Sequence, residues 1–239
     1  MSALKRILNK DIKSITNNKL SSLGIFIEFC DDNFYQAKAL IKGPKDSLYE
    51  GSFLLFEIEF PKNYPFSPPT VHYISRNNIR IHPNLYTGVT SNYRGKVCLS
   101  ILGTWSGPKW TTIMDISTVL ISIQSLLDNN PLHHEPGQEN NNTKLNEYYN
   151  ETIFYESINT LLMKNIIDIP DGFEIFHTIM IEDLTNNYQF IYEKLKQKKE
   201  NYKKTLRIQI PFYRISLDLN YKILYKKYIE FCNIYNLKI

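Results

Sequence analysis

Four prolines stand within the short segment 61–69, and they constrain the fold more than any other feature of this sequence. Proline fixes its own φ angle, lacks a backbone N–H, and disfavours helix at the residue before it. The segment is therefore expected to be an extended, rigid connection. The apolar runs on either side of it, 52–60 and 70–74, are typical of β-strands. We predict that the prolines join two neighbouring strands.

Two further apolar runs precede this pair, at 24–30 and 34–42. Between them, Asp31-Asp32-Asn33 is typical of a hairpin turn, and Gly43-Pro44 ends the second run. Four strands in sequence with short connections indicate an antiparallel meander.

Helices are predicted on both sides of these strands. Apolar side chains recur every three or four positions in the first 15 residues, and Ser2 is suited to cap that helix. Ile113–Leu127 carries a nearly continuous apolar face and predicts a central buried helix. This mixture of separate helices and antiparallel strands indicates an α+β fold.

The polar residues 138–144 predict a loop that leads into a helical section. Apolar spacing in that section predicts further helices, two of them near 174–205 and 216–236. We therefore divide the chain into a core domain over residues 1–140 and a helical C-terminal extension over residues 141–239.

Charge and composition exclude several classes of protein. The 239 residues carry 28 Lys and Arg against 24 Asp and Glu, and a net charge of +4 is too near balance for a nucleic-acid-binding protein. No apolar run reaches the roughly 18 residues that a membrane span needs, and charges interrupt the N-terminus where a signal peptide would be apolar. Three widely separated cysteines are typical of a reducing compartment. We expect an intracellular protein of the cytoplasm or nucleus, with neither nucleic acid nor membrane as partner.

Cofactor and metal sites find little support in the sequence. Six residues separate Gly88 from Gly95-Lys96-Val97, and no Ser or Thr follows the lysine, so the phosphate-loop pattern fails. His133-His134-Glu135 offers metal-ligand residue types, but adjacent residues rarely converge on one ion and no second cluster supports them. We expect no cofactor and no metal.

Residues 81–112 show little periodicity and are rich in Gly, Pro, Asn, Ser and Trp. An irregular stretch of this length inside a compact domain is usually functional. It holds Cys98 directly after Gly95-Lys96-Val97, and a cysteine in such a segment is a candidate nucleophile. The residues alone leave open a buried structural cysteine instead.

Several short motifs give the chain a resemblance to the ubiquitin-conjugating enzyme family. They are Gly-Pro-Lys-Asp-Ser-Leu-Tyr-Glu-Gly-Ser-Phe at 43–53, Phe-Pro-Lys-Asn-Tyr-Pro-Phe-Ser-Pro-Pro at 60–69, His82-Pro83-Asn84 and Val97-Cys98-Leu99. The run from Cys98 to Trp110 and the Asn-Pro-Leu-His-His-Glu-Pro-Gly at 130–137 resemble the large Z-type subgroup and the conjugating domain of the giant apoptosis-inhibitor ligase.

The resemblance implies a ubiquitin-conjugating fold and a two-step acyl transfer. Cys98 would accept ubiquitin or a ubiquitin-like protein as a thioester from an activating enzyme, then pass it to a substrate lysine or a ubiquitin ligase. ATP would be consumed by the activating enzyme and not by this chain. A catalytically silent ubiquitin-binding or scaffold protein of the same fold is the alternative, although silent variants typically lack the cysteine.

The resemblance also assigns roles beside Cys98. Asn84 would order the adjacent loop or donate to the developing oxyanion, and both roles stay open. His82 is expected to pin the segment through its ring nitrogens rather than act as a base, with Pro83 and Leu99 as structural neighbours. The sequence offers no Cys–His dyad, so we expect no strongly depressed pKa for the Cys98 thiol.

The incoming lysine has to lose a proton, because its ordinary pKa is about 10.4. Better-known members of the family place an acidic residue for this purpose in the loop after the central helix. Counting from Asn130-Pro131 gives His133, whereas alignment on an acid before proline gives Glu135. We favour Glu135, because a carboxylate can both orient and discharge an ammonium group.

Contacts with partner enzymes are expected at Lys5 and Arg6 on the first helix, at Phe66 and at Trp110. From the sequence, Phe66 could be a buried aromatic or an exposed contact. Trp110-Thr111-Thr112 departs from the Ser-Pro-Ala that usually follows this tryptophan, which argues against ordinary RING-type docking. A longer spacing between Asn84 and Cys98 than most of the family has predicts an inserted surface loop at Thr87–Tyr93.

Overall fold

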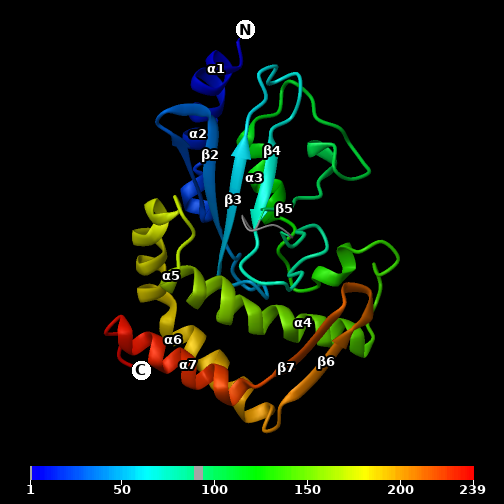
Figure 1. Ribbon diagram of the computed structural model, residues 1–239, viewed down its shortest axis with the longest axis vertical. Helices are drawn as coiled ribbons and strands as arrows, with labels where there is room; N and C mark the ends of the chain where they lie inside the picture. The colour runs from blue at the N-terminus through cyan, green and yellow to red at the C-terminus, as the bar shows by residue number, and fades with distance from the viewer. Residues whose placement is uncertain (1, 89–93) are drawn as a thin grey trace.

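The computed structural model describes residues 2–88 and 94–239, and a five-stranded antiparallel sheet forms its framework (Figure 1). Leu40 pairs with Leu55 across the second and third strands, and Phe56 pairs with Tyr73 across the third and fourth. The predicted meander is confirmed, and a short fifth strand is added at its edge. In spatial order the strands are β1 (Ile25–Cys30), β2 (Asn33–Lys42), β3 (Phe53–Glu59), β4 (Thr70–Ile74) and β5 (Arg94–Lys96).

The proline segment connects β3 to β4, as predicted. Residues 61–69, all of which the structure describes, form neither helix nor strand. The buried Tyr64 hydroxyl donates a hydrogen bond to the carboxylate of Asp11, which also accepts one from the backbone N–H of Ile116 at 2.9 Å. This carboxylate therefore ties the proline connection to two helices.

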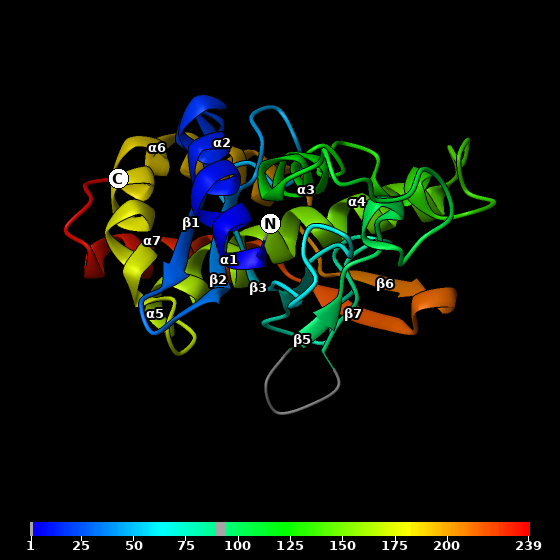
Figure 2. The same cartoon turned by 90° about the horizontal axis from the view of Figure 1, so that it is seen from above.

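The N-terminal helix runs through α1 (Ala3–Arg6), the π-helical turn η1 (Ile7–Asp11) and α2 (Ile12–Asn17). The Ser2 side chain accepts a hydrogen bond from the backbone N–H of Lys5, so the predicted cap is confirmed. A 3₁₀ turn, η2 (Leu20–Leu23), leads into β1. Figure 2 shows α2 beside α3, the central helix.

Helix α3 (Ile116–Gln124) is shorter than the predicted 113–127. Asp115 ends it on the N-terminal side, because its side chain accepts a hydrogen bond from the backbone N–H of Thr118 at 3.0 Å and caps the helix there. Ile113 lies before this cap and is 78% exposed. The predicted apolar face of the helix is buried, as expected.

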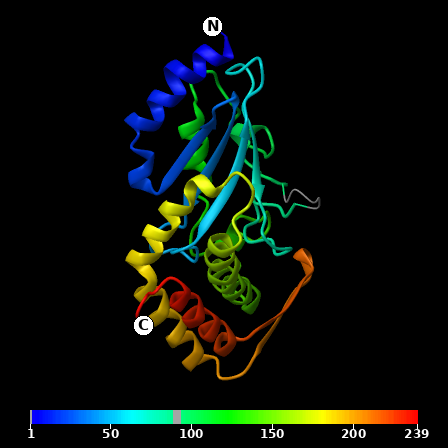
Figure 3. The same ribbon diagram turned by 60° about the vertical axis from the view of Figure 1, so that its left-hand side comes forward.

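Both faces of the sheet are covered, and successive residues of β3 serve different faces. Leu54 and Phe56 belong to the hydrophobic core that includes Ile116 and Leu120 of α3. Phe53 and Leu55 belong to a second core, formed with the C-terminal helices (Figure 3). Burial on both sides explains why the run at 52–60 is apolar almost without interruption.

The C-terminal extension contains more than helices. Its helical elements are α4 (Lys144–Glu156), the π-helical η5 (Ser157–Lys164), α5 (Asn165–Ile167), the 3₁₀ turn η6 (Glu174–Phe176), α6 (His177–Asn201) and α7 (Tyr221–Ile234). Helix α6 confirms the prediction near 174–205. The helix predicted near 216–236 begins too early, because residues 216–219 belong to β7 (Ile215–Leu219), which pairs antiparallel with β6 (Leu206–Ile210).

These residues form a strand instead of a helix because apolar and polar side chains alternate along them. Apolar residues recur at every second position in both strands, and Ile208 pairs with Leu217. Asn220 then caps α7 by accepting a hydrogen bond from the backbone N–H of Ile223 at 3.0 Å. The β6–β7 hairpin runs beside α4, and its tip is the 3₁₀ turn η7 (Pro211–Tyr213) (Figure 1).

Two sequence predictions stay predictions at this level. Residues 89–93 of the expected insertion at Thr87–Tyr93 lie outside the described residues. The division at residue 140 is untested, although Tyr149 and Ile153 of α4 pack into the same core as α3.

Among the described residues, no helix combines the length and the apolar character that a membrane crossing requires.

Candidate active site

Cys98 lies just after the edge strand β5, and its backbone is paired with the segment that contains Asn84. The backbone N–H of Cys98 donates to the carbonyl of Asn84 at 2.8 Å, and the side-chain Nδ2 of Asn84 donates to the carbonyl of Cys98, also at 2.8 Å. Leu85 and Val97 form a bridge of β type next to this pair. Each of the two residues is thus held by the other through two hydrogen bonds.

A third residue holds the same segment from the side of η3 (Ser100–Leu102). The hydroxyl of Thr104 accepts a hydrogen bond from the backbone N–H of Leu99 at 2.9 Å and lies 2.7 Å from the carbonyl of Val97, to which it donates. The two residues that flank Cys98 are therefore fixed. No role for Thr104 was inferred from the sequence, because a threonine in an irregular loop gives no distinctive signal.

His82 is completely buried and acts on the backbone of the Asn84 segment. Its Nδ1 accepts a hydrogen bond from the backbone N–H of Asn84 at 3.0 Å. Burial, and to a lesser extent the neighbouring His134 ring, lowers the pKa of His82 to about 3, so the ring is neutral near pH 7. This geometry has His82 pinning the loop, in line with the expected structural role. Pro83 and Leu99 are buried beside it.

The Cys98 residue is only 1% exposed, and burial raises the pKa of its thiol. Lys96, Arg80 and the side chain of Tyr86 act in the opposite direction, whereas the negative charge of Glu135 raises the pKa further. The absence of a strongly depressed thiol pKa agrees with the sequence prediction.

Glu135 and His133, the two candidates for handling the incoming amine, point to different partners. The carboxylate of Glu135 accepts a hydrogen bond from the hydroxyl of Tyr213 at 2.5 Å and acts electrostatically on Cys98. Nε2 of His133 lies 3.1 Å from the carbonyl of Asn141. Both residues follow or lie within the 3₁₀ turn η4 (Pro131–His134).

Arg80 links the residues around this carboxylate, and no role for it was predicted from the sequence. Its guanidinium carbon lies 3.6 Å from the ring centre of Tyr86 and 4.7 Å from that of Tyr213. The guanidinium also donates to the carbonyl of Pro83. Proximity to His82-Pro83-Asn84 could have drawn attention to Arg80, but Tyr213 lies too far along the chain for any local pattern to reveal it.

Of the four predicted partner-binding residues, Phe66, Trp110 and Lys5 remain candidates, whereas Arg6 does not. Phe66 is 73% exposed, so the buried alternative is wrong, and it lines a hollow with Trp105 and Trp110. The indole N–H of Trp110 donates to the carbonyl of Pro65 at 2.7 Å, which fixes one wall of that hollow. Lys5 is exposed.

The prediction for Arg6 is wrong. This residue was predicted to face a partner, but it is buried, and its guanidinium donates to the carbonyl of Met114 at 2.6 Å and lies 3.6 Å from the carboxylate of Asp11. The Asp11 carboxylate draws the arginine inward because a buried charge needs a partner. Its helical neighbour Lys5 forms no ion pair with any other residue that the structure describes.

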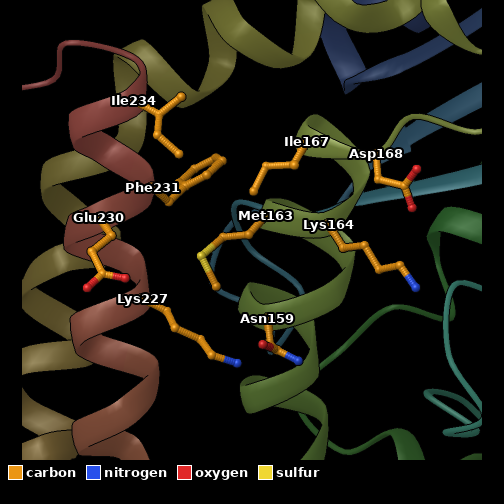
Figure 4. A pocket seen from close by; sticks show the side chains of 9 residues that line it. All are labelled: Asn159, Met163, Lys164, Ile167, Asp168, Lys227, Glu230, Phe231 and Ile234. Carbon is orange, nitrogen blue, oxygen red and sulfur yellow. The ribbon is translucent and has the colours of Figure 1, made fainter.

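A second hollow lies between η5, α5 and α7 (Figure 4). Met163, Ile167 and Phe231 give it an apolar lining, with Lys227 and Glu230 at its side. None of the predicted site residues is among its described lining residues. Within residues 2–88 and 94–239, no cluster of three or more His, Cys, Asp or Glu side chains could hold a metal ion.

Comparison with known proteins places this site in a family. The family model described as "Ubiquitin-conjugating enzyme" matches residues 7–159, which is well over half of the chain. The chain belongs to the ubiquitin-conjugating enzyme family. The predicted α+β conjugating fold is confirmed.

Within the family, the resemblance to the Z type is also confirmed. The chain is 37% identical over 189 residues to ubiquitin-conjugating enzyme E2 Z of Xenopus tropicalis, a match that covers 77% of this chain and 57% of that protein. It is 43% identical over 154 residues to ubiquitin-conjugating enzyme E2 Z of Homo sapiens, covering 63% and 41% respectively. The chain thus spans about half the length of the curated relatives it matches.

Among solved structures, the E2 domain of a Toxoplasma gondii ubiquitin conjugating enzyme is similar to this chain, with 24% sequence identity and a TM-score of 0.45. That match covers 62% of this chain and 94% of the other.

Proposed function

We propose that this chain accepts ubiquitin or a ubiquitin-like protein as a thioester on Cys98 and transfers it to a lysine or to a ligase. The observation that carries this proposal is the reciprocal pairing of Cys98 with Asn84, which fixes the backbone of the thiol-bearing residue against the Asn84 amide in a chain of this family. Sγ of Cys98 attacks the thioester carbonyl on the activating enzyme, and the thiolate of that enzyme leaves.

In the second step the nitrogen of a lysine attacks the thioester carbonyl on Cys98. The C–S bond breaks, the Cys98 thiolate leaves, and the proton of the amine passes to a base. Both steps create a transient negative charge on the carbonyl oxygen, which a nearby N–H donor stabilises. ATP is spent when the activating enzyme forms the first thioester, so this chain needs no cofactor for either step.

Asn84 supports the second step mainly by ordering the loop. Its Nδ2 already donates to the Cys98 carbonyl, and its Oδ1 is buried without a hydrogen-bond partner among the described residues. Burying the Asn84 oxygen without a hydrogen-bond partner costs free energy. A single bond, from Nδ2 to the Cys98 carbonyl, holds the Asn84 side chain in place. The oxyanion role would require Nδ2 to exchange one acceptor for another.

Glu135 is the better candidate for receiving the amine, because its charge acts on Cys98 whereas the His133 ring is turned to Asn141. We expect Glu135→Ala to leave charging of Cys98 intact and to slow discharge onto free lysine about 10- to 100-fold, since a positioned base contributes on that order or more. Single-turnover discharge of a purified thioester measures this directly.

His133→Ala, in the same loop, is expected to change the discharge rate less than about twofold, because the His133 ring is turned to the Asn141 carbonyl. The reverse ranking of the two variants would assign the amine to His133. Equal discharge rates in Glu135→Ala and the parent would remove Glu135 from the chemistry.

The hollow lined by Phe66, Trp105 and Trp110 is the proposed docking site for a ligase, and the exposed Lys5 is a proposed contact of the activating enzyme. The hydrogen bond to the Pro65 carbonyl fixes Trp110, and the Phe66 side chain is exposed to solvent. Together they form a small aromatic surface that a partner protein could bind. Thr111 and Thr112 change the chemistry at its rim, so the preferred ligase should differ from that of ordinary RING-dependent relatives.

A further inference from the structure

The carboxylate of Glu135 is held by a residue 78 positions further along the chain. Tyr213 donates a hydrogen bond to Oε2 of Glu135 with an O···O distance of 2.5 Å. A hydroxyl bonded to a carboxylate at this distance is charge-assisted and roughly twice as strong as a neutral bond. Tyr213 ends the turn η7 at the tip of the β6–β7 hairpin, so the C-terminal extension contacts the loop that follows the central helix.

The Tyr213 ring is itself fixed from two directions. Its centre lies 5.4 Å from the ring centre of Tyr149 on α4, and the Arg80 guanidinium carbon is 4.7 Å away. The hydroxyl of Tyr149 donates to the carbonyl of Arg80 at 2.7 Å, which joins these two supports to each other. The phenol is therefore a donor whose position is set by α4, by the segment after β4 and by the hairpin.

Tyr213 also keeps its proton over the working pH range. Burial raises the pKa of its hydroxyl, and the hydrogen bond to Glu135 raises it further. An ionised carboxylate can only accept, so the phenol of Tyr213 is the donor in this hydrogen bond.

We propose that Tyr213 is a positioning residue that orients the Glu135 carboxylate toward the amine arriving at Cys98. The proposal rests on the proposed role of Glu135 in discharge. A half-buried glutamate without this bond would sample several rotamers, and only a fraction of them would present the carboxylate to the amine. The extension would thus contribute to the second step of the reaction and leave the first step unaffected.

The test begins with Tyr213→Phe, which removes one oxygen atom and keeps the ring between Tyr149 and Arg80. We expect charging of Cys98 within about twofold of the parent, and discharge onto free lysine about three- to tenfold slower, the range that one net hydrogen bond supplies. Tyr225→Phe is the matched control, because it removes a hydroxyl that bonds Tyr192 between α6 and α7. Its discharge rate should equal that of the parent.

Two further measurements separate positioning from a general loosening of the hairpin. Hydroxylamine is already neutral near pH 7 and needs no carboxylate to discharge it, so Tyr213→Phe should react with it at the parental rate. In a Glu135→Ala background, Tyr213→Phe should have no additional effect on lysine discharge, because the group that it positions is gone.

Equal slowing with lysine and hydroxylamine, or full additivity with Glu135→Ala, would overturn the positioning role. An unchanged lysine rate in Tyr213→Phe, together with a slow Glu135→Ala, would overturn this inference and leave the proposed function of Glu135 standing. If Glu135→Ala itself discharges at the parental rate, the role of Glu135 fails and the inference fails with it.

Discussion

Truncation after residue 140 will give a protein that does not unfold cooperatively, because one face of the sheet loses its cover. Leu40, Phe53, Leu55 and Ile74 are all buried in the core that the C-terminal helices complete. Burial of a side chain of this size contributes about 1.5–3 kcal/mol, so exposing four of them costs about 6–12 kcal/mol. That loss is comparable with the whole stability of a typical domain, about 5–15 kcal/mol.

Point substitutions in η6 test the same interface in the full chain. Phe176 is 1% exposed within the second core, and Phe176→Ala is expected to lower the free energy of unfolding by about 3–5 kcal/mol. Its neighbour Ile175 is 55% exposed, and Ile175→Ala should change it by less than about 0.5 kcal/mol. Urea unfolding measures both variants. A cooperative, soluble fragment 1–140 with parental unfolding behaviour would contradict the shared core.

Asn84→Ala should slow discharge of the Cys98 thioester about 10²–10³-fold while charging continues. Exchange of one thioester for another has a lower barrier than attack by an amine, so the second step depends more strongly on an ordered loop and on an oxyanion donor. The variant deletes Nδ2, the atom that holds the Cys98 carbonyl. The rate is measured by adding free lysine to the thioester and monitoring its loss on non-reducing gels.

Alkylation of the protein before it carries ubiquitin distinguishes the two roles of Asn84. If the amide orders the loop, the buried Cys98 thiol becomes more accessible in Asn84→Ala and reacts faster with iodoacetamide. If the amide serves only the oxyanion, alkylation is unchanged although discharge is slow. Asn187→Ala is a control, because its side chain donates a hydrogen bond to the Asp183 carbonyl on the same helix. Parental discharge in Asn84→Ala would contradict both roles.

The sequence was sufficient for those parts of the fold that follow from local patterns. The proline segment, the four main strands, the Ser2 cap and the helix near 174–205 each depend on residues close together in the chain. The β6–β7 hairpin was missed because an alternation of only five residues at 215–219 is a weak signal, and pairing with β6 is what establishes the strand.

The site shows the same division. His82, Asn84 and Cys98 could be predicted because they lie in short motifs. No motif marks Arg80, which donates to the Pro83 carbonyl, or Tyr213, which holds the Glu135 carboxylate. Tyr213 meets Glu135 only through the fold of the whole extension. The prediction for Arg6 failed for a related reason: whether a helical arginine faces solvent depends on a distant carbonyl and carboxylate that the helix pattern does not contain.

Charging of the parent and two Cys98 variants with activating enzyme, ATP and ubiquitin tests the central claim most directly. Intact-mass analysis of the parent should show one ubiquitin adduct that dithiothreitol removes. Cys98→Ser should give an oxyester that survives dithiothreitol, and Cys98→Ala should give no adduct. An adduct that persists in Cys98→Ala would move the nucleophile to Cys30 or to the buried Cys232. No adduct in the parent, with ubiquitin or any ubiquitin-like protein, would mean a silent binding protein.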